Sequence, residues 1–259
     1  MKIEELMTKE VVTIDKDRKL SDALELMEKH RISRLVVVNE GRIVGMVTDK
    51  DILEVMGSSR YAKKLPSSLH VSTAMSKGVI TIGKNANVTE AARLMLEHKI
   101  KSLPVVNDDE LVGIVTTTDL LKPLQDSEEG VEKVMTRQVI TVSPEDRAIH
   151  ARRLMLDNGI SRLVVVEEGR IAGILTERQL GRALGAFKSA ADSKQANRVR
   201  NLIVEDVMTQ TVVTLSNDST VGEAASLMLE RGFSGIPIVD SSDSLVGIVT
   251  KTDLVKLLA

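Results

Sequence analysis

Four segments of the chain place a threonine three residues before an acid or an amide, each time after a glycine and two apolar residues. They are Thr48 with Asp51, Thr116 with Asp119, Thr250 with Asp253, and Thr176 with Gln179. Two kinds of chemistry suit this spacing. In a capping box, the two side chains satisfy free N–H groups at the start of a helix. In a nucleotide site, the helix N-terminus attracts phosphate and the carboxylate accepts hydrogen bonds from ribose hydroxyls.

The two interpretations differ over Gln179. A capping box accepts glutamine about as readily as an acid. An uncharged amide, in contrast, should hold a ribose less well than a carboxylate does. The nucleotide interpretation therefore predicts that the four copies are chemically unequal. The motif alone does not choose between the two interpretations, and both can hold together.

Basic side chains recur beside this motif. Arg34 and Arg162 directly precede apolar runs that we expect to be buried strands. Lys50 and Arg178 lie inside the turn of the motif, and Lys101 occupies the loop before residue 103. Guanidinium groups near helix starts suit phosphate recognition. Each of these charges alone is also compatible with a solvated surface, but their recurrence at matching positions favours a phosphate site.

The elements that must position these residues repeat with the motif. In the first copy, residues 10–14, 35–38 and 43–47 read as strands and residues 20–27 and 48–55 as helices. The unit is therefore β-α-β-β-α. The matching opening strands are residues 79–82, 139–142 and 212–215, and the matching central strands are residues 103–106, 163–166 and 236–239. A Met-Thr or Met-Ser pair opens each unit, at Met7, Met75, Met135 and Met208. The recurring helix residues Met27, Met95, Met155 and Met228 are expected to fill the core.

A second periodicity groups the units in pairs. Residues 32–38 and 160–166 are identical, whereas the second and fourth copies carry Pro104 and Pro237 in the central strand. A duplicated pair explains this pattern, and the acidic linker around residue 126 separates the two pairs. The expected units are residues 1–56, 71–125, 130–185 and 202–259, and the expected pairs are residues 1–125 and 126–259.

Composition narrows the function classes. Thirty-five basic and 37 acidic residues give a net charge of -2. This overall charge argues neither for nor against a nucleic-acid or acidic partner. The absence of cysteine excludes disulfides and thiolate chemistry and fits a cytoplasmic protein. No apolar run reaches the roughly 18 residues that span a bilayer, and the acidic N-terminus does not resemble a signal peptide. The rarity of aromatic residues argues against single-stranded nucleic acid.

No residue pattern indicates an enzyme. The histidines are His30, His70, His98 and His150, and no two of them have metal-ligand spacing. No serine nucleophile has a recognisable base. We therefore expect a protein that is not an enzyme, has no catalytic cofactor and has no metal site of its own. The basic stretch from Lys188 to Arg200 is interpreted as a solvated linker, with nucleic-acid binding as its alternative.

The chain resembles cystathionine-β-synthase (CBS) domains, four in tandem. The resemblance covers nearly the whole chain and rests on the Met-Thr opening, the Ile-x-x-Leu-(Pro/Val)-Val-Val strand and the Gly-h-h-Thr-x-x-Asp turn. It implies an α/β fold in which two repeats pack through their sheets into a Bateman module with two clefts. Two such modules would form a flat disc, a layout similar to the gamma subunit of AMP-activated protein kinase.

The family pattern implies that the Thr and Asp of one repeat hold phosphate and ribose while the partner repeat encloses the adenine. One cleft would combine Thr48 and Asp51 with Ser76, Thr81, Ile100, Lys101 and Ser102. Its twin would combine Thr116 and Asp119 with Thr8, Thr13, Ile32, Ser33 and Arg34. In the second module, Thr250 and Asp253 would join Thr136, Thr141, Ile160, Ser161 and Arg162. The fourth cleft, which we expect to be weak or empty, would contain Thr176, Gln179, Thr209, Thr214, Phe233 and Ser234, with Gly235 where the odd repeats have arginine.

This resemblance implies a non-catalytic sensor that binds AMP, ADP or ATP and signals to a partner protein. Magnesium would arrive with ATP rather than in a carboxylate cage. S-adenosylmethionine is the alternative ligand, although the basic residues favour phosphates. A homodimer is expected by the same resemblance. The remaining alternative is an interaction disc or a nucleic-acid binder whose clefts are empty.

Overall fold

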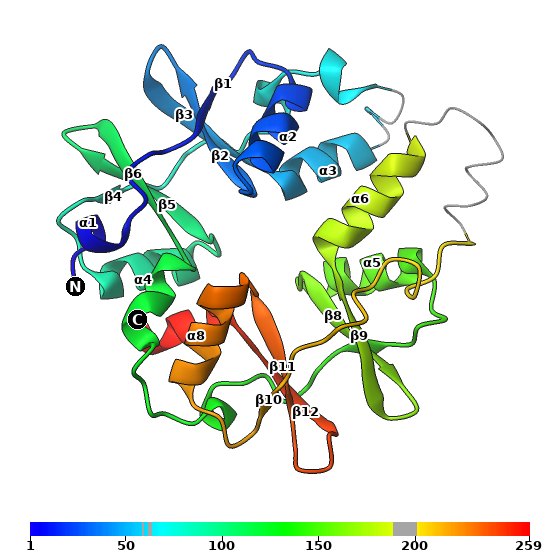
Figure 1. Ribbon diagram of the computed structural model, residues 1–259. Helices are drawn as coiled ribbons and strands as arrows, with labels where there is room; N and C mark the ends of the chain where they lie inside the picture. The colour runs from blue at the N-terminus through cyan, green and yellow to red at the C-terminus, as the bar shows by residue number, and fades with distance from the viewer. Residues whose placement is uncertain (59, 62–63, 189–200) are drawn as a thin grey trace. The chain divides into compact units, whose positions relative to one another are not determined.

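The computed structural model describes residues 1–58, 60–61, 64–188 and 201–259. Within them, the β-α-β-β pattern occurs four times, each time with one three-stranded sheet and with an α-helix or a 3-10 helix after it (Figure 1). Most of the basic stretch that ends at Arg200 lies outside the described residues. No helix among the described residues is long and apolar enough to cross a bilayer.

The first two repeats have these elements. Repeat one contains α1 (Ile3–Leu6), β1 (Thr13–Asp15), α2 (Leu20–Lys29), β2 (Arg34–Asn39), β3 (Arg42–Thr48) and α3 (Asp49–Gly57). Repeat two contains the 3-10 helices η1 (Pro66–Ser68) and η2 (Val71–Thr73), then β4 (Ile82–Gly83), α4 (Val88–Glu97), β5 (Ser102–Asn107), β6 (Glu110–Thr116) and η3 (Asp119–Leu124).

The last two repeats follow the same order. Repeat three contains η4 (Val131–Lys133), β7 (Thr141–Val142), α5 (Ala148–Asp157), β8 (Arg162–Glu167), β9 (Arg170–Thr176) and α6 (Glu177–Lys188). Repeat four contains β10 (Leu215–Ser216), α8 (Val221–Arg231), β11 (Gly235–Val239), β12 (Leu245–Thr250), α9 (Lys251–Val255) and η5 (Lys256–Leu258).

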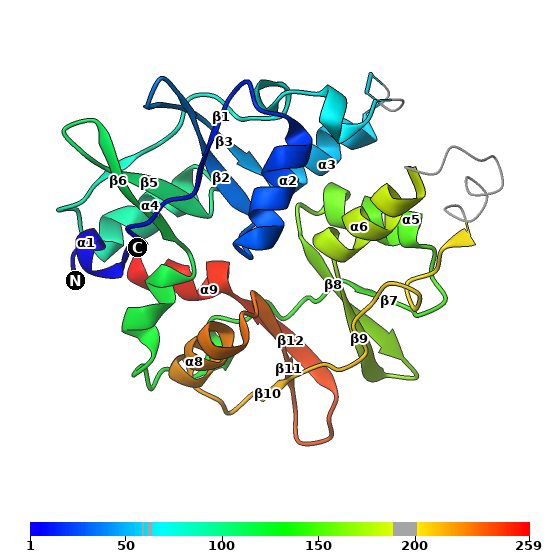
Figure 2. The same ribbon diagram turned by 45° about the horizontal axis from the view of Figure 1, so that its top comes forward.

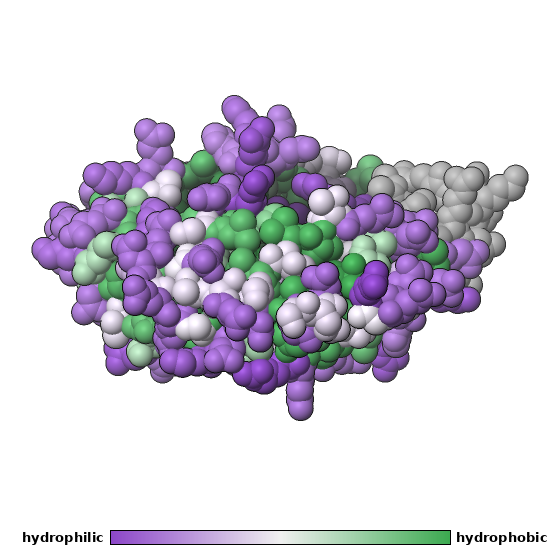
Figure 3. All heavy atoms as spheres, turned by 60° about the horizontal axis from the view of Figure 1, so that its bottom comes forward, coloured by the Kyte–Doolittle hydropathy of each residue, from purple (hydrophilic) through white to green (hydrophobic). Residues whose placement is uncertain are grey.

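In every sheet the central strand pairs in parallel with the opening strand and antiparallel with the return strand. The helices pack on the sheets, as α2 and α3 do on β2 and β3 in both views (Figures 1 and 2). The side chains between these elements are apolar and buried. The four methionines at matching helix positions, Met27, Met95, Met155 and Met228, are all buried, so their assignment to the core is confirmed. Figure 3 shows hydrophilic side chains over much of the surface, with apolar ones among them.

The opening strands are shorter than the sequence predicts, and proline explains the difference between odd and even repeats. In repeat one, β1 begins where Thr13 pairs with Val36, but in repeat two β4 begins only where Ile82 pairs with Val105. Pro104 occupies the position of Val36. Pro104 pairs with Ile114 of β6. The N–H and C=O of Ile114 bond to Thr8 and not to residue 104, so the backbone groups of residue 104 face the opening strand. Proline has no N–H to donate there, and Pro237 has the same effect at β10.

One predicted helix is a 3-10 helix. The sequence pattern predicts an α-helix after Thr116, but residues Asp119–Leu124 form η3, with Pro123 inside it. Proline removes a backbone donor and clashes with the preceding turn, so a regular α-helix cannot continue through it. The buried side chains of η3 are Leu120, Leu121 and Leu124.

The described chain divides into two compact units, Met1–Thr116 and Thr117–Ala259. The first unit holds the sheets of repeats one and two, and the second holds the sheets of repeats three and four. The second unit also includes η3, which packs against α8 and α9. The division falls between Thr116 and Thr117, whereas the sequence predicts the boundary between residues 125 and 126. The helix η3 lies between these two positions.

Candidate functional site

The Met-Thr or Met-Ser opening of each repeat is bridged to the last strand of the other repeat in its pair. In the first unit, Thr8 exchanges two backbone hydrogen bonds of 2.9 Å with Ile114. Ser76 exchanges bonds of 2.8 and 3.1 Å with Met46. The second unit has the equivalent bridges Thr136 to Ile248 and Thr209 to Ile174. Every bridge lies two residues before the Thr of the Thr-x-x-Asp/Gln motif, so each motif is built beside its partner's opening segment.

The glycine of the motif is required by the methionine of the partner's opening. A Cβ placed on Gly45 would lie 2.9 Å from Met75 Sδ and 2.9 Å from the carbonyl oxygen of Ser76. The same methionine-to-glycine contact recurs in the pairs Met7 with Gly113, Met208 with Gly173, and Met135 with Gly247. The sequence shows both residues in every repeat, but only the structure shows that they form one contact between repeats.

Thr48 and Asp51 form a capping box at the start of α3. The Thr48 N–H and Oγ1–H both donate to Asp51 Oδ2, at 2.8 and 2.7 Å. The Asp51 N–H donates to Thr48 Oγ1 at 3.2 Å. Both bonds from Thr48 use a single carboxylate oxygen, so the cap does not require Oδ1.

Gln179 forms the same cap on α6. Its Oε1 accepts from the Thr176 N–H and Oγ1–H at 2.8 and 2.7 Å, and its own N–H donates to Thr176 Oγ1 at 3.3 Å. Gln179 Nε2 donates to Thr209 Oγ1 at 2.7 Å. Because an amide caps the helix as well as a carboxylate does, capping alone does not explain why the other three copies carry aspartate.

The other two aspartates each face a lysine three residues later. Asp253 is buried, with 5% of its surface exposed. Its Oδ2 accepts from the Thr250 N–H and Oγ1–H at 3.0 and 2.7 Å, and its Oδ1 accepts from Lys256 Nζ at 2.9 Å. Asp119 Oδ1 accepts from Lys122 Nζ at 3.3 Å. Thr116 is the last residue of the first compact unit, and Asp119 is the first residue of η3 in the second.

Arg34 and Arg162 are the first residues of the central strands β2 and β8, and both are half-buried. Arg34 Nη2 lies 3.5 Å from Ser33 Oγ in its own loop. Arg162 instead reaches the fourth repeat, where Nη2 donates to Ser234 Oγ at 2.7 Å. Burial lowers the pKa of Arg162 to about 10, and the Asp253 carboxylate acts in the opposite direction. The guanidinium therefore keeps its charge at neutral pH.

A cavity of about 280 Å³ lies at the Gln179 motif. It is lined by Arg162, Ile174, Thr176, Gln179, Thr209, Thr211, Val212, Val213, Gly232, Phe233, Ser234 and Gly235. Five of the six residues predicted for the fourth cleft therefore come together, and Thr214 does not line the cavity. The sequence reasoning did not include Thr211, Val212 and Val213, although they lie in the stretch between Met208 and β10.

The remaining predicted residues lie at the strand starts and in the loops before them. Thr13 and Thr141 begin β1 and β7, while Thr81 and Thr214 precede β4 and β10 by one residue. The pre-strand loops are held against the preceding helices by backbone bonds from Ile32 to Met27, from Ile100 to Met95, and from Ile160 to Met155, each 2.9 Å long. Ser102 is buried at the start of β5, Lys101 is exposed, and Ser161 is half-buried.

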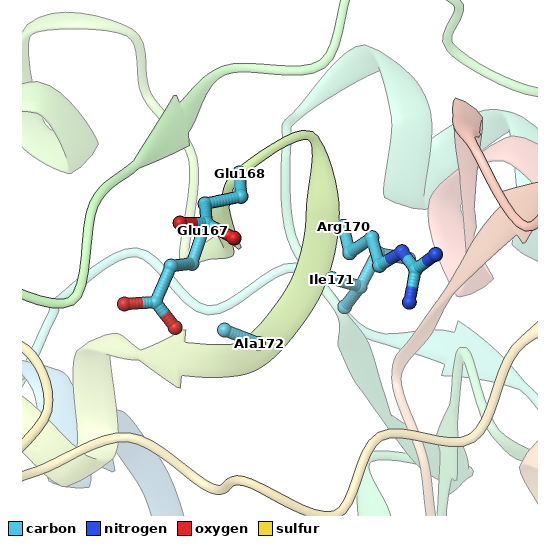
Figure 4. Close-up of a pocket in the computed structure, with 5 residues that line it drawn as sticks. All are labelled: Glu167, Glu168, Arg170, Ile171 and Ala172. Atoms are coloured by element: carbon cyan, nitrogen blue, oxygen red, sulfur yellow. The ribbon is translucent and has the colours of Figure 1, made fainter.

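A second hollow lies at the hairpin between β8 and β9. Its lining residues, Glu167, Glu168, Arg170, Ile171 and Ala172, all belong to that one hairpin (Figure 4). None of them belongs to a Thr-x-x-Asp/Gln motif. No group of three or more histidine, aspartate or glutamate side chains in the described part of the chain is placed to hold a metal ion.

Comparison with known proteins agrees with the repeat pattern. The model of the CBS domain matches residues 3–58, 71–126, 131–186 and 204–259. Protein MJ1225 of Methanocaldococcus jannaschii is 30% identical over 97% of this chain and 96% of its own length. Protein MJ1404 of the same organism is 30% identical over 99% of this chain and 62% of its own length.

The fold is also similar to that of solved structures. The crystal structure of MJ1225, a proposed archaeal homologue of g-AMPK, superposes with a TM-score of 0.87 at 28% identity, with both chains fully covered. A conserved protein from Pyrococcus horikoshii has the same fold, with a TM-score of 0.71 at 24% identity over both full chains. On the four matched segments, the repeated motifs and the repeated sheet, this chain belongs to the CBS-domain family, with four CBS domains in tandem.

Proposed function

We propose that this chain is a non-catalytic regulatory protein that binds AMP, ADP or ATP in the clefts between paired CBS domains. The observation that carries the proposal is the pair of equivalent caps at Asp51 and Gln179. Since the fold accepts glutamine in the cap, the aspartate in the other three copies points to a role beyond capping. A carboxylate oxygen beside a helix start suits ribose hydroxyls, which donate hydrogen bonds to it.

The pairing of the repeats supports the clefts themselves. Each motif lies beside the opening segment of the partner repeat, and in the second unit a cavity forms there. We assign the ligand contacts of the three aspartate clefts to the residues named by the family pattern. The fourth, with Gln179, is the weakest for a ligand held through its ribose.

The basic residues favour a phosphorylated ligand over S-adenosylmethionine, which carries adenosine without phosphate. Arg34, Lys101 and Arg162 lie in the pre-strand loops or at the strand starts next to them, where a guanidinium or ammonium group suits phosphate. The full-length similarity to MJ1225, a proposed homologue of g-AMPK, is consistent with this choice.

We further propose that each pair of CBS domains, residues 1–125 and 126–259, acts as one ligand-responsive module. A bound nucleotide would shift the population of each module toward the conformation that it binds most tightly. A partner protein, or a second copy of this chain in a homodimer, would respond to that shift. The signal would then report the energy or metabolite status of the cell.

Isothermal titration of the nucleotide-stripped full chain tests the proposal. The ligands are AMP, ADP, ATP and S-adenosylmethionine, with the variants Asp51→Ala, Asp119→Ala and Asp253→Ala alongside. We expect saturable binding of a phosphorylated adenosine that each aspartate variant weakens and Gln179→Ala does not. No binding of any of the four ligands by folded protein would refute the proposal and leave the motif as a cap only.

A further inference from the structure

Arg162 belongs to the third repeat by sequence but contacts the fourth. Its Nη2 donates to Ser234 Oγ at 2.7 Å. Its guanidinium lies over Gly235, where a Cβ would clash with Nη1. Gly235 stands at the position of Arg162 in its own repeat, and this missing side chain creates the space that Arg162 fills.

The cavity at Gln179 differs from the other motif sites in its charge. Hydroxyl groups and apolar side chains line most of it, Arg162 is its one charged lining residue, and none of the lining residues is aspartate or glutamate. Glutamine has replaced the carboxylate that the other three motifs present. An anion that enters this cavity therefore meets a guanidinium and hydroxyl donors without a facing negative charge.

We propose that the Gln179 cavity is an anion site for a phosphorylated ligand held through its phosphate, with Arg162 as its cation. This inference deepens the proposed function, on which it rests, by giving the fourth cleft a ligand chemistry of its own. Weak contact with a ribose and strong contact with a phosphate are compatible, because Gln179 and Arg162 act on different groups of the ligand.

The same arginine links the two clefts of this pair. Its guanidinium contacts Ser234 and Gly235 in the Gln179 cavity, and the family pattern gives Arg162 to the Asp253 cleft. One guanidinium cannot bind an anion in both places at once. Phosphate in the Gln179 cavity therefore competes with phosphate in the Asp253 cleft, and binding at one site weakens binding at the other by a reciprocal factor.

Inorganic pyrophosphate is the probe for the Gln179 cavity, titrated into the full-length triple variant Asp51→Ala, Asp119→Ala, Asp253→Ala. Because pyrophosphate can also bind the basic residues assigned to the clefts of the first pair, Arg34→Gln and Lys101→Gln are added to this background. We expect one remaining site, whose affinity falls at least tenfold when Arg162→Gln is added. The matched control is Arg170→Gln, which removes the same charge from the nearby hairpin and should change the affinity less than twofold. No pyrophosphate binding, or binding that Arg162→Gln leaves unchanged, overturns the inference.

Gly235→Ala separates the two possible positions of Arg162. The added Cβ excludes the guanidinium from Ser234 and leaves it free to face Asp253. We expect weaker pyrophosphate binding in the same variant background and unchanged or tighter ADP binding at Asp253 in the otherwise native chain. The opposite pattern would assign Arg162 to the Asp253 cleft and overturn the inference. Ser234→Ala, which removes only the hydrogen bond, provides a second variant if Gly235→Ala unfolds at a lower temperature.

The two proposals fail in different ways. If the native chain shows no aspartate-dependent ADP binding, the nucleotide function fails. Pyrophosphate binding is still measured separately, because the triple variant lacks all three motif carboxylates. If ADP binds as expected but pyrophosphate does not depend on Arg162, only the anion site fails.

Discussion

The substitution Asp51→Gln converts the first copy of the motif into the natural third copy, and it separates capping from ligand binding. The two caps have the same hydrogen bonds, with lengths of 2.8, 2.7 and 3.2 Å at Asp51 and of 2.8, 2.7 and 3.3 Å at Gln179. A cap of this kind contributes about 0.5–2 kcal/mol to stability. Because the glutamine retains it, we expect the free energy of unfolding to change by about 0.5 kcal/mol or less.

The affinity for ADP should fall in the same variant. A hydrogen bond to a charged acceptor contributes about 1.5–3 kcal/mol, and one to a neutral acceptor about 1 kcal/mol. The difference of roughly 0.5–2 kcal/mol corresponds to binding that is about 2–30-fold weaker. Asp51→Ala, which removes the cap as well, should lose both affinity and stability.

The assay is isothermal titration of ADP in the Asp119→Ala, Asp253→Ala background, so that the Asp51 cleft is measured alone, with urea unfolding in parallel. The control is Glu40→Gln, which likewise replaces a carboxylate with an amide, in the exposed hairpin between β2 and β3 of the same repeat. Unchanged ADP affinity in Asp51→Gln would refute the reasoning, because the motif would then serve only as a cap. A loss of stability as large as that of Asp51→Ala would refute the claimed equivalence of the caps.

Three further predictions concern the framework around the sites. Gly113→Ala should destabilise the first unit by about 1–3 kcal/mol, because the new Cβ would clash with Met7 Sδ and lie 3.1 Å from the carbonyl oxygen of Thr8. Gly83→Ala, which has no atom within 4 Å, is the control in chemical denaturation, and equal losses would contradict the contact. Thr220→Ala should cost about 0.5–2 kcal/mol, because Thr220 Oγ1 accepts from the Glu223 N–H at 3.1 Å; thermal unfolding at an unchanged temperature would count against it. Pro104→Val should supply the N–H that lets the opening strand begin one residue earlier, seen as slow amide exchange at residue 104, whereas exchange at the rate of an exposed loop would show that another constraint shortens β4.

Much of the fold could be predicted from the sequence, because the signals are local. Strand alternation, helix periodicity and turn residues act over a few positions, and they predict the β-α-β-β-α unit and the buried methionines correctly. Boundaries were predicted less well. The opening strands are shorter than the β-branched runs suggest, since pairing with the central strand rather than propensity decides where they start.

The candidate site divides in the same way. The capping boxes at Thr48, Thr176 and Thr250 follow from a spacing of three residues, and the structure contains all three. The sequence did not predict which of the two clefts of the second pair Arg162 contacts. Its direction depends on Gly235, which lies more than seventy residues away in the sequence.

The sequence by itself determined that this protein has four CBS domains arranged as a duplicated pair, with one motif copy that lacks the carboxylate. These are properties of residue type and spacing, which the chain carries before it folds. Only the tertiary structure decided that each opening methionine packs on its partner's motif glycine, and that Arg162 extends over Gly235 into the Gln179 cavity. Both contacts join residues far apart in the chain, and their geometry depends on packing between repeats, for which no local pattern exists.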